Sequence, residues 1–188
     1  MKRSAFALLL ALAACQETPT ATLAPLPLTA ESVGHYCQMN LLEHPGPKAQ
    51  VHLDGLPGAP LFFSQVRDAV AYARLPEQSH VIQAIWVNDM GAPGATWDDP
   101  GATNWIKADT AYYVVGSARE GGMGAPELVP FAAADAAQAF AGVEGGKVLR
   151  LDDIPDTAVI ADDAPDTDPG AEAEFAARIK ALSNRNGD

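Results

Sequence analysis

The middle of the chain contains the same succession of predicted elements twice. Alternating apolar residues predict two strands, a run with apolar residues three and four apart predicts a helix, and a third strand follows. The first copy spans 49–54, 61–63, about 64–73 and 80–87, and the second copy spans 111–116, 127–131, 132–141 and 146–151. Each copy holds roughly 40–50 residues, which gives only a marginal core, so we expect the two copies to pack together.

This pattern predicts an α+β fold of two related ββαβ modules, at residues 31–90 and 109–155. We expect Ser64 to cap the first helix. The inner faces of the two helices are expected to be Val66, Ala69, Val70 and Ala73, and Ala136, Ala139 and Phe140. The connector 91–108 contains Trp97 and Trp105, which we expect to pack onto the body. The alternative is that these tryptophans line a partner surface.

The start of the chain has the features of an export signal. Lys2 and Arg3 precede an apolar run, residues 5–14, which is shorter than the about 20 residues needed to span a bilayer as a helix. The run has the size of a signal-peptide hydrophobic region. Residues 12–15, Leu-Ala-Ala-Cys, resemble a bacterial lipobox. We therefore predict a signal peptide at 1–14 and lipidation of Cys15; the alternative is an ordinary secretory signal with a chance cysteine.

Two further segments lie outside the predicted modules. Residues 15–30 are rich in Thr, Pro and Ala and are predicted to form a flexible tether behind the lipidated cysteine. Residues 156–188 are predicted to form an acidic, partly disordered tail. A short helix from about 170 to 183 is expected within this tail, with Phe175, Ile179 and Leu182 on one face.

The charge of the chain excludes some partners. Twelve basic and 24 acidic residues give a net charge of −12. Without Lys2 and Arg3, ten basic residues against 24 acidic ones give −14. Such a charge argues against nucleic acid and against electrostatic binding to anionic lipid. It fits a soluble periplasmic domain that attracts a cation or a basic partner.

The number of cysteines in the chain identifies Cys37 as a candidate site residue. With Cys15 committed to lipid, Cys37 has no intramolecular disulfide partner in an oxidising compartment. It is either a small buried apolar residue or a metal ligand or nucleophile. On an extended backbone Met39 would face the same side, and thiolate and thioether together favour copper(I). The alternative is a chance Cys-x-Met pair with both side chains in the core.

Other residues could complete a metal site. Met123 lies between glycines in a loop, where we expect a mobile third sulfur ligand; the alternative is an exposed methionine tolerated there. His35 is the predicted nitrogen donor, and His44 in a Pro/Gly turn could also supply one. His52 and His80 are interpreted as structural, and Met90 as a bystander. No cysteine pair has the spacing of a structural zinc site.

Together these motifs resemble the NosL family of copper-chaperone lipoproteins. The resemblance covers the segments 12–15, 36–39, 111–117, 122–124, 127–131 and 145–148. It implies two related modules and one copper(I) ion, bound in the periplasm and delivered towards nitrous-oxide reductase through a membrane transporter complex. In the family the Cys-x-Met motif carries copper, which implies Cys37 and Met39 here, and the Gly-Met-Gly loop implies Met123. The acidic end beyond Ile154 is outside the resemblance.

Two rival functions remain open at this point. The chain could be a metal-free scaffold lipoprotein of a transporter complex that docks through its tryptophan connector. It could also be an enzyme like the organomercurial lyases, with Cys37 as nucleophile, although such an enzyme requires a second thiol. We expect no enzymatic activity, and we expect the anchor to hold the domain on the periplasmic side of a membrane, the outer rather than the inner one.

Overall fold

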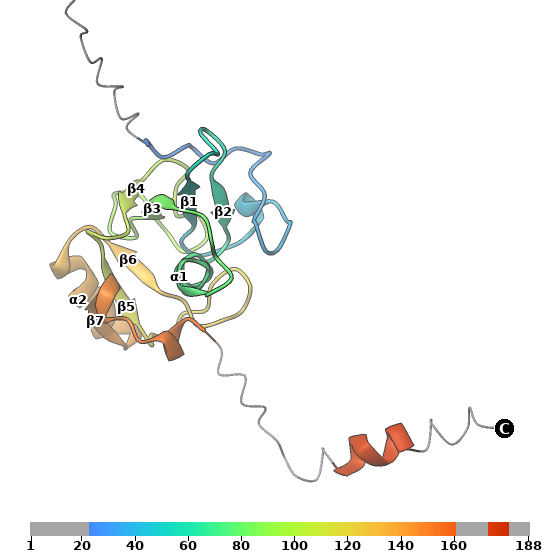
Figure 1. Ribbon diagram of the computed structural model, residues 1–188. Coiled ribbons are helices and arrows are strands. Elements are labelled where there is room, and N and C mark those ends of the chain that lie inside the picture. The colour runs from blue at the N-terminus through green and yellow to red at the C-terminus, as the bar shows by residue number, and fades with distance from the viewer. Residues whose placement is uncertain (1–22, 161–172, 181–188) are drawn as a thin grey trace, which may run out of the picture.

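Two antiparallel sheets form the body of the protein (Figure 1). The computed structural model describes residues 23–160 and 173–180. The first sheet has the strand order β2-β1-β3-β4, and the second has the order β6-β5-β7. The predicted signal peptide and Cys15 lie outside the described residues.

The first sheet is built around β1 (Ala49–Leu53), whose five residues are all buried. Its neighbours are β2 (Leu61–Phe63) and β3 (Ile82–Asn88), and β4 (Trp105–Lys107) pairs with the outer side of β3. Helix α1 (Val66–Arg74) follows β2 and contacts β1, β2 and β3. A short 3-10 helix, Leu41–Glu43, precedes β1.

The second sheet is smaller and has β5 (Tyr112–Val115) at its centre. Its neighbours are β6 (Val129–Phe131) and β7 (Lys147–Arg150), and helix α2 (Ala134–Glu144) packs on all three strands. Two 3-10 helices, Leu151–Asp153 and Asp156–Ala158, follow β7. The chain therefore has a mixed α/β fold with antiparallel sheets.

One hydrophobic core joins the two sheets. The main cluster contains Val51 and Val87 of the first sheet together with Tyr113 of the second, all fully buried. The Tyr113 hydroxyl donates a hydrogen bond to the Ala108 carbonyl at 2.8 Å, so its burial leaves the donor satisfied. A smaller cluster under α2 contains only four fully buried residues. The two sheets thus depend on a common interior, as expected for units this small.

Two predicted details of the helices are wrong. Helix α1 begins at Val66 behind Gln65, which makes no capping hydrogen bond with its side chain, so Ser64 is not the cap. In α2, Ala139 is exposed and Ala137 is buried instead. Ala136 and Phe140 pack against the smaller cluster as predicted, together with Ala141, so the inward face differs from the prediction only in having Ala137 and Ala141 in place of Ala139.

The connector contributes a strand to the first sheet, although it was predicted only to join the two modules. Its last residues form β4, which pairs with β3 through Asn88 and Trp105. Trp97 packs against the smaller cluster, with the Arg119 guanidinium 5.2 Å from the centre of its ring. Both tryptophans therefore lie against the body, as expected.

The predicted boundaries of the terminal segments need correction. Residues 23–29, predicted as tether, lie on the first sheet, because Gln50 in β1 binds both backbone groups of Leu26 at 2.9 Å and Leu28 is buried. The tail prediction is wrong for 156–160, where Val159 is buried and its carbonyl accepts from Arg67. Residues 173–180 form a helix within the predicted range. No described helix has the length and apolar character needed to cross a membrane.

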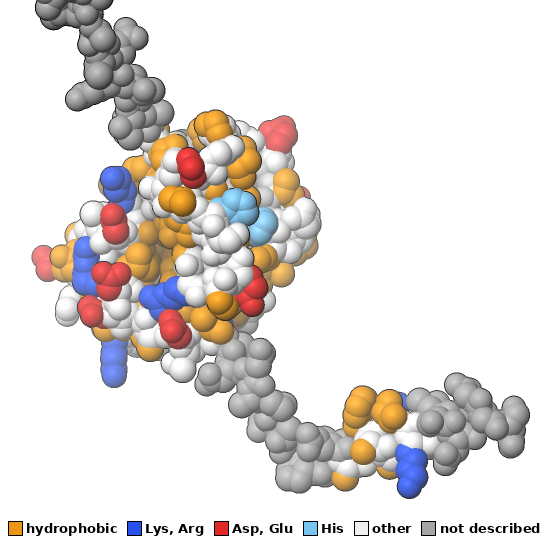
Figure 2. Space-filling model, viewed as in Figure 1, with side chains coloured by type: hydrophobic (Ala, Val, Ile, Leu, Met, Phe, Trp, Pro, Cys, Tyr) orange, Lys and Arg blue, Asp and Glu red, His pale blue; other side chains and the backbone are white. Residues whose placement is uncertain are grey.

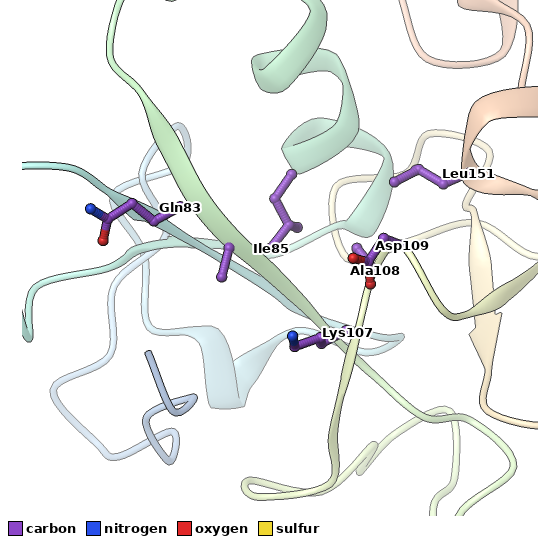
Figure 3. A pocket seen from close by; sticks show the side chains of 7 residues that line it. Gln83, Ile85, Lys107, Ala108, Asp109 and Leu151 are labelled. Carbon is purple, nitrogen blue, oxygen red and sulfur yellow. The ribbon is translucent and has the colours of Figure 1, made fainter. Parts of the chain in front are cut away.

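A cavity of about 140 Å³ lies between β3, the end of β4 and the start of the C-terminal segment (Figure 3). Its lining residues are Gln83, Ala84, Ile85, Lys107, Ala108, Asp109 and Leu151. This set contains no sulfur and no imidazole, so the cavity is not the predicted metal site.

Candidate metal site

Cys37 and Met39 lie in a tight hairpin, residues 33–40, which we call the sulfur hairpin. Val33 and Asn40 form an antiparallel bridge, and the Gly34 N–H donates to the Met39 carbonyl at 3.0 Å. The hairpin is attached to β2 because the His35 N–H donates to the Phe62 carbonyl at 2.6 Å. This attachment fixes the segment on the edge of the first sheet.

The extended backbone assumed from His35 to Met39 is wrong. Residues 35–37 form a turn, and Gln38 adopts a left-handed φ of 55°. The Gln38 side chain stabilises this turn by donating to the His35 carbonyl at 2.7 Å and the Gly34 carbonyl at 3.3 Å. Because side chains alternate only on an extended chain, spacing alone does not place the two sulfurs, or the His35 ring, on one side.

Both sulfur side chains of the hairpin are accessible. Cys37 is a free, partly exposed cysteine, and Met39 is 40% exposed. The Cys37 Sγ packs directly on Gly34, where an added Cβ would collide with the sulfur and would lie 3.3 Å from Leu41. The reading of Cys37 as a buried apolar residue therefore does not hold. The close approach of backbone to sulfur explains the glycine at position 34.

Met123 lies at the tip of a second turn, residues 120–126, which we call the Met123 loop. Glu120 and Pro126 close the loop with an antiparallel bridge, and the Gly121 N–H donates to the Ala125 carbonyl at 2.8 Å. Met123 is 45% exposed, so its thioether also reaches solvent. The loop is closed by its own hydrogen bonds, and the mobility expected of its methionine stays a prediction.

Gln65 holds the Met123 loop from the start of α1. Its Oε1 accepts from the Met123 N–H at 3.1 Å, and its Nε2 donates to the Ala125 carbonyl at 3.3 Å. Gln65 is fully buried, and this use of its amide explains why it does not cap α1. A residue next to α1 thereby fixes the position of the loop that precedes β6.

The Met123 loop also packs against the turn that carries His44. A Cβ added to Gly122 would lie 2.7 Å from the His44 Cβ and 3.1 Å from the Pro45 carbonyl oxygen. Only a glycine permits this contact between the two segments. The His44 Nε2 is buried and has no hydrogen-bond partner among the described residues. An unpartnered imidazole nitrogen beside a sulfur-bearing loop is a candidate metal donor.

Two buried ionisable groups lie under the His44 turn and the Met123 loop. Lys48 is 1% exposed, and its Nζ donates to the carbonyls of Pro45, at 3.0 Å, and Gly46. Burial lowers the pKa of Lys48 to about 8, while the charges of Glu127 and Cys37 oppose that shift.

Glu127 lies directly beneath the loop. Its Oε1 accepts from the backbone N–H groups of Arg67, at 3.0 Å, and Leu128, at 2.8 Å. Its Oε2 has no partner among the described residues and faces Gly121, which leaves no room for a Cβ there. Burial raises the pKa of Glu127 to about 8, and the two backbone hydrogen bonds oppose that shift.

The structure places His35 in an aromatic cluster. Its ring centre lies 5.2 Å from Tyr36 and 5.6 Å from each of Phe63 and Tyr72. Histidine side chains (pale blue) border hydrophobic atoms on the face shown in Figure 2. The aromatic packing explains the position of His35 without a metal, which makes His44 the stronger nitrogen candidate.

Of the remaining candidates, His52 and Met90 lie elsewhere in the fold, whereas His80 lines a cavity together with Tyr36 of the sulfur hairpin. His52 is buried in β1, with its Nε2 3.0 Å from the Gln50 Oε1, and His80 is exposed in the turn before β3. Met90 packs against the smaller cluster. Within 23–160 and 173–180, no three His, Cys, Asp or Glu side chains gather as a metal site would require.

Sequence reasoning missed Gln65, Lys48 and Glu127. The signal that could have revealed them is a polar or charged side chain at the edge of an apolar strand or helix, since such groups are buried only with partners. The sequence pattern does not predict which hydrogen-bond partner each of these side chains has.

These features define a class of protein: an α/β domain that carries a free thiol and two accessible thioethers on hydrogen-bonded loops beside an unpartnered imidazole. Such a donor set suits a soft metal ion. The chain belongs to the NosL family, whose sequence model matches residues 25–159.

Relatives and solved structures agree with this assignment. The chain is 59% identical over 177 residues to the copper-binding lipoprotein NosL of Achromobacter cycloclastes, covering 94% of this chain and 91% of the relative. It is 36% identical over 121 residues to its Stutzerimonas stutzeri counterpart, covering 64% and 60%. The crystal structure of the copper chaperone NosL from Shewanella denitrificans superposes with a TM-score of 0.65 at 29% identity, covering 71% of this chain and 96% of the other.

Proposed function

We propose that this chain is a copper(I)-binding chaperone lipoprotein that delivers copper for the maturation of nitrous-oxide reductase. The observation that carries the proposal is that accessible sulfurs of two segments distant in the sequence meet the same turn: the Met123 loop packs against the His44 turn, and the 3-10 helix Leu41–Glu43 joins that turn to the sulfur hairpin. The relatives named as copper-binding lipoproteins and as a copper chaperone support the same reading.

The proposed ligand set is Cys37, Met39 and Met123, with His44 in place of the originally expected His35. Thiolate and thioether donors select copper(I) over harder ions. We replace His35 by His44 in the ligand set because the His44 Nε2 is buried and has no hydrogen-bond partner among the described residues. The His35 ring instead packs against three aromatic rings. The ion is the cargo of the protein and would leave with each delivery.

The proposed mechanism of transfer follows from exposure. When Cys37 binds the ion, its thiol releases a proton to solvent, so acid weakens binding. Met39 and Met123 are each close to half exposed, so a donor from an acceptor protein can enter the coordination sphere before a chaperone ligand leaves. No redox step is needed, since copper stays monovalent throughout.

The remaining parts of the proposal concern location and partners. We propose that Cys15 is lipidated, that residues 1–14 are removed as a signal peptide, and that the domain faces the periplasm from the outer membrane. A membrane transporter complex and nitrous-oxide reductase are the proposed partners, with no enzymatic activity in the chain itself. A tether would keep the domain near membrane partners and raise its effective concentration there.

We also propose that the two halves are related ββαβ modules. The supporting observation is that β1-β2-α1-β3 and β5-β6-α2-β7 follow one element order, with the first strand central in each sheet.

A copper(I) titration of the 16–188 chain against a chromophoric copper(I) chelator tests the proposed function. We expect one ion per chain, and we expect Cys37→Ser to lower the affinity at least about a hundredfold, a change of roughly 2.8 kcal/mol. Cys37→Ser should leave the unfolding transition nearly unchanged, because the side chain is partly exposed. Absence of stoichiometric binding by the parent chain would favour the scaffold function instead.

A further inference from the structure

A separate cavity opens beside the sulfur hairpin. It has a volume of about 240 Å³ and is lined by Tyr36, Tyr72, Leu75, Glu77, Gln78 and His80. None of the proposed copper ligands is among these residues. The rings of Tyr36 and Tyr72 have centres 6.5 Å apart and an angle of 63° between their planes, so they form two walls that are not parallel.

The walls and the rim of this cavity are held in place. Tyr36 and Tyr72 each pack against Phe63, with ring centres 5.3 Å and 5.5 Å apart. The Gln78 side chain donates to the His80 carbonyl at 2.7 Å and accepts from the His80 N–H, which fixes the turn before β3. A preformed cavity loses little conformational entropy when it binds a ligand.

The electrostatics of the cavity favour a cation. No salt bridge within residues 23–160 and 173–180 involves Glu77; the two that occur join Arg74 to Asp156 and Arg119 to Glu144. Glu77 lines the cavity and is exposed, so its carboxylate can face a cation that enters from solvent.

The arginines of α1 do not fill the cavity with positive charge. Arg67 donates to the Val159 carbonyl, and Arg74 donates to carbonyls at 151 and 154 and to Asp156. Their guanidinium groups are thus engaged by the C-terminal segment.

We propose that this cavity is a docking pocket for an arginine side chain presented by the protein that receives the metal. A guanidinium group can stack on the tyrosine rings and at the same time pair with the Glu77 carboxylate through two parallel hydrogen bonds. A lysine ammonium lacks the flat surface and the second donor in that geometry. The assignment of the occupant to the metal acceptor rests on the proposed function.

The position and charge of the pocket support this occupant. Tyr36 forms part of the wall and is the neighbour of Cys37 in the chain, so an arginine in the pocket would bring the acceptor surface next to the thiol. The net charge of −12 attracts a basic partner and increases its rate of encounter.

Arginines of the chain itself are internal competitors for the pocket. Arg178 lies on the helix 173–180, and the sequence has a further arginine, Arg185, after that helix. The test must therefore separate an external arginine from these internal ones.

Nuclear magnetic resonance titration of the isotope-labelled 16–188 chain with the blocked tripeptide acetyl-Gly-Arg-Gly-amide provides the test. We expect chemical-shift changes at Tyr36, Tyr72 and Glu77. The lysine peptide should bind several-fold more weakly, and the glutamine peptide should cause no saturable change. Glu77→Gln should weaken arginine binding about tenfold, whereas Glu31→Gln, which removes an exposed acid outside the lining, should have no effect.

Two outcomes would overturn the proposal. One is equal binding of the arginine peptide to the parent chain and to Glu77→Gln, or shifts only at other residues. The other is binding that is measurable only after Arg178 and Arg185 are both replaced by Gln, which would make an arginine of the chain itself the occupant. Copper(I) affinity should be the same in the parent chain and in Glu77→Gln, so a failure of the docking pocket is distinguishable from a failure of copper binding.

Discussion

The two sheets share an order of strands and helix but differ in what they bury. The first sheet buries several polar side chains, including Lys48, Gln50, His52 and Asn88, whereas the buried interior under α2 consists of Val114, Val129, Phe131 and Ala137. The polar groups of the first sheet hold loops: Gln50 binds residue 26, and Lys48 binds the His44 turn. One sheet thus positions the candidate site, and the other contributes the Met123 loop and Glu127.

The largest expected effect concerns the two interiors. Phe63 is 1% exposed in the shared core, whereas Phe140 is only partly buried under α2. We expect Phe63→Ala to lower the free energy of unfolding by about 3–5 kcal/mol and Phe140→Ala to lower it by roughly half as much. Urea denaturation measures both values. Equal losses would show that the smaller cluster is as tightly packed as the main core.

A second prediction concerns the pH dependence that Glu127 brings. The pKa of this carboxyl rises from 4.5 to about 8 on folding, so the folded state binds a proton that the unfolded state releases between those values. The contribution of Glu127 to the free energy of unfolding is therefore present at low pH. It is lost as pH rises from about 4.5 to 8, and the total loss is a few kcal/mol.

The variant Glu127→Gln isolates this effect. Its free energy of unfolding, relative to that of the parent chain, should increase steadily between pH 5 and pH 8. The control Glu120→Gln removes an exposed acid and should follow the parent at every pH. A constant difference between the Glu127→Gln and parent curves would mean that Glu127 titrates alike in both states.

Gln65 tests the link between the two halves. Replacement by Leu removes both hydrogen bonds to the Met123 loop and should lower the free energy of unfolding by about 1–3 kcal/mol. Because the loop loses its fixed position, copper(I) affinity should fall about tenfold. Gln83→Leu is the matched control, since Gln83 is exposed and its hydrogen bond to Asp54 is distant from the loops. An unchanged copper(I) affinity in Gln65→Leu would mean that binding does not require the hydrogen bonds between Gln65 and the Met123 loop.

The smallest expected effect separates the two histidines. We expect His44→Gln to weaken copper(I) affinity by about three- to tenfold, which corresponds to the loss of one neutral donor. His35→Gln should leave it unchanged, since that ring packs among aromatic side chains. The same chelator competition measures both, and the opposite ranking would restore His35 to the site.

The regular elements were predictable because periodicity of apolar residues decides which face of a strand or helix is buried. The sulfur hairpin was not, because its turn depends on a left-handed Gln38 and on a hydrogen bond to Phe62, 27 positions away from His35. Alternation along the chain could not anticipate either feature.

The residue types of the candidate site could be predicted from the sequence, but their arrangement in space could not. The residue types of Cys37, Met39 and Met123 indicate a soft ion wherever they lie. Their arrangement depends on Gln65, which is 58 positions from Met123, and on Glu127, which is 60 positions from Arg67. Contacts between residues so far apart in the sequence are determined by the packing of the whole fold, so a local sequence pattern cannot predict them.

We propose that thioethers of both halves and the thiol of the first half hold one ion. X-ray absorption spectroscopy of the copper(I)-loaded 16–188 chain counts the sulfur atoms around the metal. We expect three sulfurs in the parent chain, two in Met123→Leu and two in Met39→Leu, with one ion per chain throughout. An unchanged sulfur count after Met123→Leu would contradict this proposal, because the second half would then contribute no ligand.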